Sequence, residues 1–76
     1  MENRVALVGI VVENFNSVEE LNRILHEYSE YLIGRMGIPY KKRDVSVISI
    51  AMDAPGDDIN ALSGKIGRLD GISSQT

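Results

Sequence analysis

The stretch VSVISIAM, residues 45–52, decides the fold of this chain. Four of its eight residues are β-branched, which favours a strand over a helix. Side chains alternate between the two faces of a strand. Both sets are apolar here: Ile48, Ile50 and Met52 on one face, and Val45, Val47 and Ala51 on the other. Such a strand must be covered on both sides, so it belongs in the interior of a sheet.

A second strand of the same kind is expected at residues 4–13, RVALVGIVVE. Its two faces are again both apolar: Val5, Leu7 and Val11 on one, and Ala6, Val8, Ile10 and Val12 on the other. We therefore expect it beside the first stretch in the centre of the sheet. The pattern leaves open which of its two faces meets the core.

Two amphipathic helices follow these strands along the chain. In the first, Ser17 and Glu20 fit a capping box, and Glu19 and Arg23 fit an i,i+4 ion pair. Its apolar residues recur at helical spacing: Val18, Leu21, Ile24, Leu25, Tyr28 and Leu32. The second helix is expected to start at Asp57, a favourable N-cap residue. Gly71 lies after its end, where a left-handed backbone conformation is needed for the C-cap. Its apolar stripe consists of Ile59, Leu62, Ile66 and Leu69.

Two weaker strands complete the pattern. From about Tyr31 the sequence LIGRMGIPY alternates irregularly. Because proline has no N–H group, Pro39 predicts that this strand sits at a sheet edge or ends at that point. A last strand starts at Ile72. The order β-α-β-β-α-β predicts one α+β domain, residues 1–76: a ferredoxin-like sandwich with an antiparallel sheet and both helices on one face. Right-handed crossovers put the first and third strands in the middle.

The composition narrows the functional classes. The 76 residues include no cysteine, 8 basic and 11 acidic residues, and the net charge is −3. Disulfides and thiolate metal sites are therefore excluded. An acidic domain makes direct nucleic-acid binding unfavourable, and the basic cluster Lys41–Arg43 is interpreted as a charged tip that blocks edge association. Without an apolar run long enough for a membrane span, and without a leader, the expected location is the cytoplasm.

No residues form a recognisable catalytic or metal-binding set. His26 is predicted to be a surface histidine beside Glu27 and Glu30. Asp53, Asp57 and Asp58 lack the alternating ligand spacing of an EF-hand, and helix capping explains the last two. We therefore predict no catalytic residue, no metal and no cofactor.

The segment Gly64-Lys65-Ile66-Gly67 matches the G-x-x-G loop of KH domains. However, the apolar period of the second helix continues through it from Leu62 to Leu69. Close packing against another helix is the preferred explanation for the two glycines, and a bound ligand is the alternative. An RNA-binding RRM has the same element order, but it needs stacking aromatics that the third strand lacks.

Three stretches together resemble the iron-only hydrogenase system regulator family: RVALVGIVVEN, IGRMGIPYKKRDVSVISIAMDAP and DINALSGKIGRL. The segment ALSGKIGRLDGI is the most specific part. Members of this family resemble stand-alone ACT-like domains, related in fold to the effector domain of nickel-responsive repressors. The resemblance implies a regulatory role connected with iron-only hydrogenase in anaerobic bacteria.

Two departures limit what this resemblance implies. The nickel repressors use histidines and a cysteine on their central strands, which this chain does not offer. ACT domains that bind amino acids carry a glycine in the loop after the first strand, and here residues 13–17 contain none. Neither nickel nor an amino-acid effector is therefore expected. An effector is still expected near that loop, at Asn14, Phe15 and Asn16, where ACT-like ligands lie, or near Gly64 and Gly67, which permit close approach of a ligand to the helix backbone.

The leading functional hypothesis is a small homo-oligomeric regulatory domain that binds an unidentified effector or a protein partner. A nucleic-acid-binding repressor and a small enzyme are the alternatives. With both helices on one face, the opposite face of the sheet is open, and an open apolar face is rare in monomers. We predict that it joins copies of the chain through Val45, Val47, Ser49 and Ala51.

Overall fold

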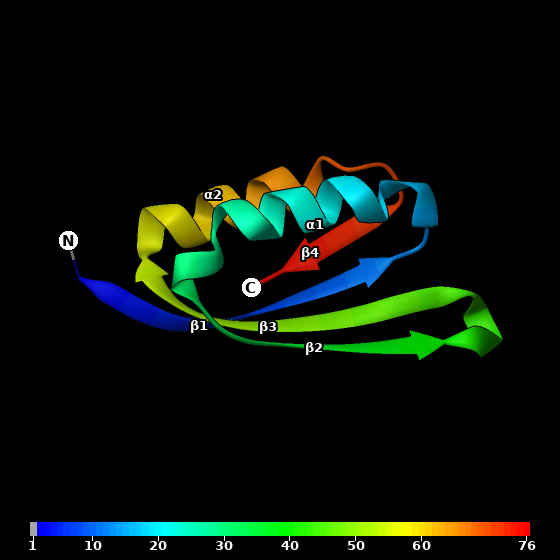
Figure 1. Cartoon of the computed structure of the whole chain (residues 1–76), viewed down its shortest axis with the longest axis horizontal. Helices are drawn as coiled ribbons and strands as arrows, with labels where there is room; N and C mark the ends of the chain where they lie inside the picture. Colours follow the sequence, from blue (N-terminus) through cyan, green and yellow to red (C-terminus); the bar gives the residue numbers. More distant parts are fainter. Residues whose placement is uncertain (1) are drawn as a thin grey trace.

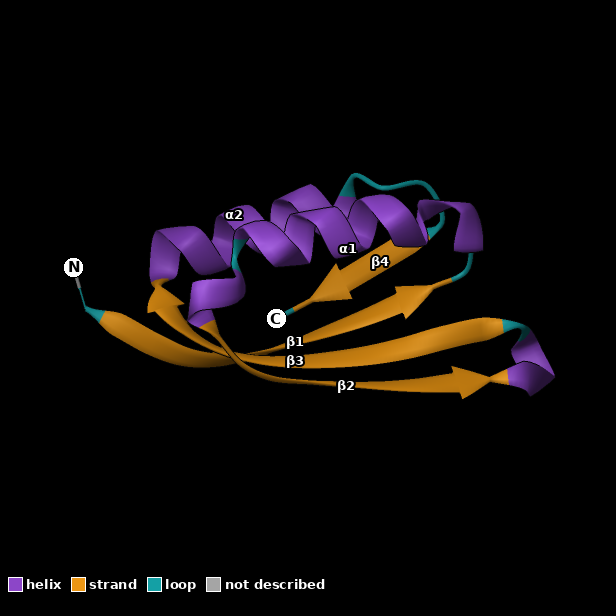
Figure 2. Ribbon diagram, viewed as in Figure 1, coloured by secondary structure: helices purple, strands orange, loops and turns teal. Residues whose placement is uncertain are grey.

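The structure is a computed structural model that describes residues 2–76. Six main elements follow one another: β1 (Asn3–Val12), α1 (Val18–Glu27), β2 (Leu32–Tyr40), β3 (Val45–Pro55), α2 (Gly56–Gly67) and β4 (Ile72–Gln75). Short 3-10 turns lie at Phe15–Ser17, Ser29–Tyr31 and Lys41–Arg43. The strands form one antiparallel sheet, and both helices lie on the same side of it (Figure 1; Figure 2). This is the predicted ferredoxin-like fold.

The strand order is β2-β3-β1-β4, so the two strands that are apolar on both faces lie in the middle as expected. β1 and β3 pair along their whole length, from Asn3 opposite Pro55 to Val12 opposite Ser46. β2 is an edge strand, which explains how it accommodates Pro39. The other edge strand, β4, is short and pairs only with the last four residues of β1.

The hydrophobic core fills the space between the sheet and the two helices. β3 contributes Ile48, Ile50 and Met52, as its parity predicted. For β1 the structure decides what the sequence left open: Val8, Ile10 and Val12 are fully buried, whereas Val5 and Leu7 are about two-thirds exposed. The helices contribute most of their predicted stripes, with these residues buried: Leu21, Ile24, Leu25, Ile59, Leu62 and Ile66. Tyr28 is buried just after α1, whereas Leu32, expected in the stripe of that helix, begins β2.

The predicted capping of α1 is wrong. The Ser17 hydroxyl does not cap the helix but donates a 2.7 Å hydrogen bond to the carbonyl oxygen of Asp70. Glu20 forms an ion pair with Arg23, which also contacts Glu27, so the expected pair with Glu19 is wrong as well. The hydrogen bond and the charge of Arg23 lower the pKa of Glu20.

The ends of α2 differ from expectation in one respect. The helix begins at Gly56 after Pro55, so Asp57 lies in the first turn and is not the N-cap. Its carboxylate still interacts favourably with the positive end of the helix dipole. After the helix, Gly71 has a φ of +70°, the left-handed conformation predicted for it.

Candidate functional site

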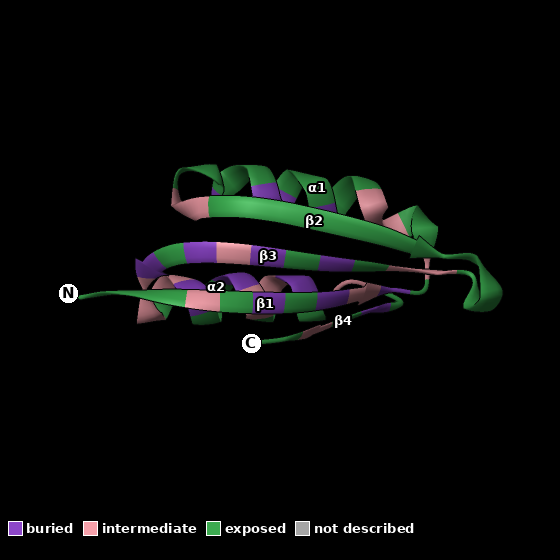
Figure 3. Cartoon of the chain, turned by 90° about the horizontal axis from the view of Figure 1, so that it is seen from below, coloured by how far each residue is buried: buried purple, intermediate pink, exposed green. Residues whose placement is uncertain are grey.

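The face of the sheet opposite the helices is open and apolar. Residues that lie opposite one another in an antiparallel ladder point to the same face. The register pairs Leu7 with Ala51, Val11 with Val47, and Val47 with Ile38. The open face therefore includes Val5, Leu7, Gly9, Val11, Gly34, Met36, Ile38, Tyr40, Val45, Val47, Ser49, Ala51, Ser73 and Gln75, with Asp53 at one end. Figure 3 shows it from the side opposite the helices.

Large apolar side chains on this open face are well exposed. The exposed fractions are 66% for Leu7, 63% for Met36, 58% for Ile38 and 42% for Val47. Of the strand residues that point to this side, only Asp53 is charged, and it lies at one end. Arg35 points to the helix side, where its guanidinium donates a 3.0 Å hydrogen bond to Asn22 of α1. The centre of the open face is therefore uncharged.

The structure places the four predicted interface residues, Val45, Val47, Ser49 and Ala51, on this face. It adds residues that the sequence analysis missed, above all Met36, Ile38 and Tyr40 of β2. A signal for them was available, because these residues share one parity in an edge strand. Ser73 and Gln75 of β4 carried no such signal because that strand is so short.

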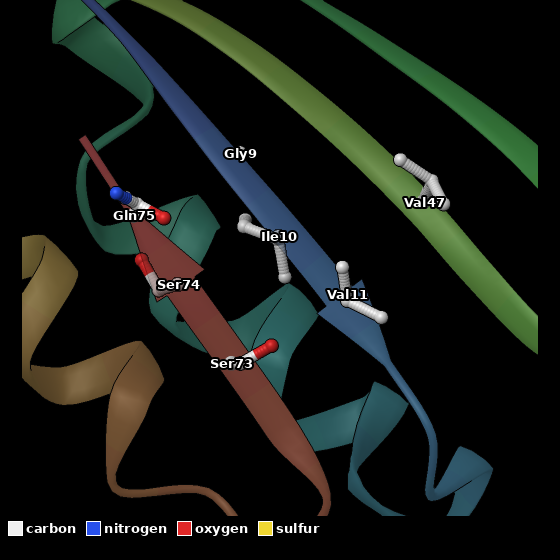
Figure 4. A pocket seen from close by; sticks show the side chains of 7 residues that line it. All are labelled: Gly9, Ile10, Val11, Val47, Ser73, Ser74 and Gln75. Atoms are coloured by element: carbon white, nitrogen blue, oxygen red, sulfur yellow. The ribbon is translucent and has the colours of Figure 1, made fainter.

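A hollow of about 250 Å³ opens on this face between β1, β3 and β4 (Figure 4). Gly9, Val11 and Val47 give it an apolar floor, and Ser73 and Gln75 supply polar groups on the β4 side. Because Gly9 has no side chain, the floor stays low at the centre of β1. The lining carries no charge, so the hollow is suited to an apolar side chain or a small neutral group.

The loop after β1 is held by the turn that follows α2. The Asn14 side chain donates a 3.0 Å hydrogen bond to the carboxylate of Asp70 and accepts one from the N–H of Asn16. Of the three loop residues predicted to bind an effector, Asn14 is thus engaged within the chain, whereas Phe15 and Asn16 are exposed. Phe15 is 49% exposed.

Gly64 and Gly67 lie on the exposed side of α2. A Cβ atom added at either position would have nothing within 4 Å, so the explanation by close helix packing is wrong. The hollow beside the loop is lined by Asn16, Glu19, Glu20 and Arg23. The groove between the helices is lined by other residues, Lys65 and Arg68 among them. Neither is lined by the two glycines, so of the two candidate effector positions only the loop lies beside one of these hollows.

Other candidate positions have unremarkable surroundings. His26 is exposed on α1 as predicted. Within residues 2–76, no group of three or more histidine, cysteine, aspartate or glutamate side chains is placed to hold a metal ion. No helix in the same range is long and apolar enough to cross a membrane.

The comparisons with known proteins agree with this architecture. The model of the TM1266-like family, described as "Iron-only hydrogenase system regulator, putative", matches residues 4–76. The chain belongs to this family. No curated protein sequence is significantly similar to it.

Two solved structures show how far the likeness of this TM1266-like chain extends. The uncharacterized protein TM1266 from Thermotoga maritima superposes with a TM-score of 0.92 at 31% identity, over 97% of this chain and 94% of that one. A formyltetrahydrofolate deformylase from Pseudomonas putida KT2440 superposes with a TM-score of 0.66 at 12% identity, over 95% of this chain but 28% of the enzyme. The second likeness concerns the fold alone.

Proposed function

We propose that this TM1266-like protein is a small regulatory domain of an iron-only hydrogenase system that acts by binding and not by catalysis. In this proposal it works as a homo-oligomer, at least a dimer, joined through the open face of the sheet. The observation that carries the proposal is this face: apolar, uncharged at its centre, and opposite the helices that form the core. Membership of the regulator family supports the regulatory part.

The energetics favour association through this face. Burial of a large apolar side chain is worth about 1.5–3 kcal/mol. Burying Val5, Leu7, Met36, Ile38 and Val47 would then contribute on the order of 10 kcal/mol per chain before the costs of association. A small domain has a total stability of about 5–15 kcal/mol, so such a gain decides which state is populated. The hollow at Gly9 offers room for a side chain of the second copy.

The same proposal assigns effector and partner contacts to the other side of the molecule. Phe15 and Asn16 are exposed beside a hollow that Glu19 and Arg23 also line, which supports an effector contact there. Gly64 and Gly67 leave open space over α2, which supports close approach of a protein partner. Both regions are accessible when the open face is covered, because they lie on the helix side or at the end of the sheet.

A genetic replacement tests the regulatory role. In a host that encodes this chain and an iron-only hydrogenase, the gene is deleted or replaced by a Val47→Lys variant, and hydrogenase transcript and activity are measured. We expect both changes to alter hydrogenase levels in the same direction. A matched variant, His26→Lys at an exposed position of α1 that lines neither hollow on the helix side, is expected to behave as wild type. Hydrogenase levels that do not respond to deletion would contradict the proposal.

A further inference from the structure

The tip of the β2–β3 hairpin and the opposite end of the sheet carry charged groups of opposite sign. The molecule is elongated, measuring 41 × 19 × 18 Å, and the hairpin of β2 and β3 extends beyond the helices at one end (Figure 1). Lys41, Lys42 and Arg43 form the tip of this hairpin, all exposed, and one carboxylate, Asp44, follows them. The ion pairs found within residues 2–76 are those of Arg23, so none of the three tip cations is paired. The tip is therefore net positive.

The opposite end of the sheet is acidic. Asp53 points to the open-face side near the end of β3, and Asp57 and Asp58 lie in the first turn of α2 immediately beyond. Glu2 precedes β1 at the same end, and Arg4 is the cation nearest to it in β1. At roughly 3.3 Å per strand residue, Asp53 lies about 26 Å from Val45, where β3 leaves the tip. The uncharged open face thus separates a positive end from a negative end.

We propose that two copies pair open face to open face with their strands in opposite directions, so that the Lys41–Arg43 tip of each copy lies at the Asp53 end of the other. This inference rests on the dimer in the proposed function and specifies its geometry. The hydrophobic attraction between the two faces is non-directional, so it does not select an orientation by itself. The charges at the ends select it, because complementary ends attract and like ends repel.

Symmetry leaves two simple arrangements for such a pair. Identical subunits normally associate around a two-fold axis. An axis along the strands would place tip against tip and Asp53 against Asp53, which brings like charges together. An axis across the strands places each positive tip at the partner's acidic end, so that every charged end faces an end of opposite charge. The second arrangement is the one proposed.

The available surface is large enough for a stable pair. The exposed parts of Val5, Leu7, Met36, Ile38, Tyr40 and Val47 together amount to on the order of 700 Å², against ~800 Å² per partner in a standard interface. Leu7, Met36, Ile38 and Val47 belong to the stretch of sheet between the two charged ends, whereas Tyr40 lies next to the tip and Val5 lies opposite Asp53 at the acidic end. An apolar centre with a charged rim is the usual composition of a specific interface.

A charge swap between two variants tests the arrangement. The first variant carries Lys41→Glu, Lys42→Glu and Arg43→Glu, and the second carries Asp53→Lys and Asp57→Lys. Each homodimer then has repulsive ends, whereas a heterodimer of the two has attractive ends at both contacts. We expect each variant alone to self-associate at least tenfold more weakly than wild type at low salt. In an equimolar mixture, random pairing would make half of the dimers heterodimers. We expect a clearly larger fraction, measured by native mass spectrometry and ultracentrifugation.

The controls separate this inference from the dimer itself. Reversal of an exposed charge on α1, Glu19→Lys, should leave self-association unchanged, and circular dichroism verifies that all variants fold. A milder pair, Lys42→Glu and Asp53→Lys, repeats the swap with one change in each chain. The tip-against-tip arrangement would also favour the heterodimer, so the weaker self-association of each variant alone separates the two arrangements. If the wild type dimerises and each variant alone associates as strongly as wild type, or no heterodimer preference appears, or Lys→Gln changes at the tip strengthen dimerisation, the opposed arrangement is wrong although the dimer stands. A monomeric wild type would contradict the dimer of the proposed function.

Discussion

The side-chain nitrogen of Asn14 donates a 3.0 Å hydrogen bond to a carboxylate oxygen of Asp70 and so joins the loop after β1 to the turn after α2. The backbone N–H groups of Glu13 and Asn14 both donate to the carbonyl oxygen of Gly71, at 2.7 and 3.2 Å. Together with the hydroxyl of Ser17 on the Asp70 carbonyl, these contacts fix where α1 begins and where β4 starts. The loop therefore has a structural role at Asn14 and Ser17, and Phe15 and Asn16 are the residues exposed for an effector.

Adding a methyl group at two different glycines is expected to change the free energy of unfolding in opposite directions. Gly71→Ala should lower the free energy of unfolding by about 2 kcal/mol or more, because φ is +70° there and the new Cβ would overlap Asn14. Gly64→Ala should raise it by up to about 1 kcal/mol, because the position is helical and open. Urea unfolding measures both at one fixed protein concentration, because the stability of any protein that self-associates, as proposed for this one, depends on its concentration. Equal effects of the two changes would contradict the account of the Asn14–Gly71 contact.

The parts of the fold that follow from local pattern were predictable, and the parts that depend on distant partners were not. The parity of residues 45–52 and the helical stripes predicted the order of the elements and the central strands. The capping box failed because the partner of Ser17 is Asp70, 53 residues further along, which no local pattern reveals. The extent of the open face became visible only with the register of β2, which places Met36 and Ile38 beside β3.

The tyrosine at the end of the turn after α1 should titrate late. The negative charge of Asp58, followed by partial burial and the charge of Glu30, raises the pKa of Tyr31 above its ordinary value near 10. A pKa that is higher in the folded than in the unfolded state stabilises the fold below the unfolded value. That contribution is lost as the pH rises through the folded value. Folding stability should therefore decline above about pH 10 more steeply in wild type than in Asp58→Asn.

Ultraviolet absorbance of tyrosinate across an alkaline titration measures this effect directly. Tyr31→Phe should remove one tyrosine transition and so identify that of Tyr31, and Asp58→Asn should move this transition to lower pH. Asp57→Asn is the matched control, because Asp57 is adjacent in sequence but is not among the groups that raise the pKa of Tyr31. An unchanged titration in Asp58→Asn would show that its carboxylate does not interact with Tyr31.

Duplex DNA should not bind appreciably to this chain at physiological salt. The net charge is −3, and the main basic cluster, Lys41–Arg43, is small and lies at a hairpin tip. Binding by phosphate contact needs several cations on one surface and weakens steeply with added salt. A gel-shift assay with hydrogenase-operon DNA tests this expectation against the repressor hypothesis. Sub-micromolar binding that salt abolishes, and that Lys42→Glu reduces, would favour a repressor acting on DNA itself.

Light scattering on the purified chain should find a dimer or a larger assembly at tens of micromolar, and Val47→Lys should dissociate it. Val47 lies between Val11 and Ile38 in the uncharged centre of the open face. An ammonium group placed there would lose its water without gaining a partner, so the dissociation constant should rise at least ~100-fold, about 3 kcal/mol. The folded monomer should tolerate the change, because Val47 is already 42% exposed. Asn60→Lys, on the opposite side of the molecule, should leave the assembly intact. A well-folded wild-type monomer at this concentration, with Val47→Lys equally stable, would show that the open face does not join copies of the chain.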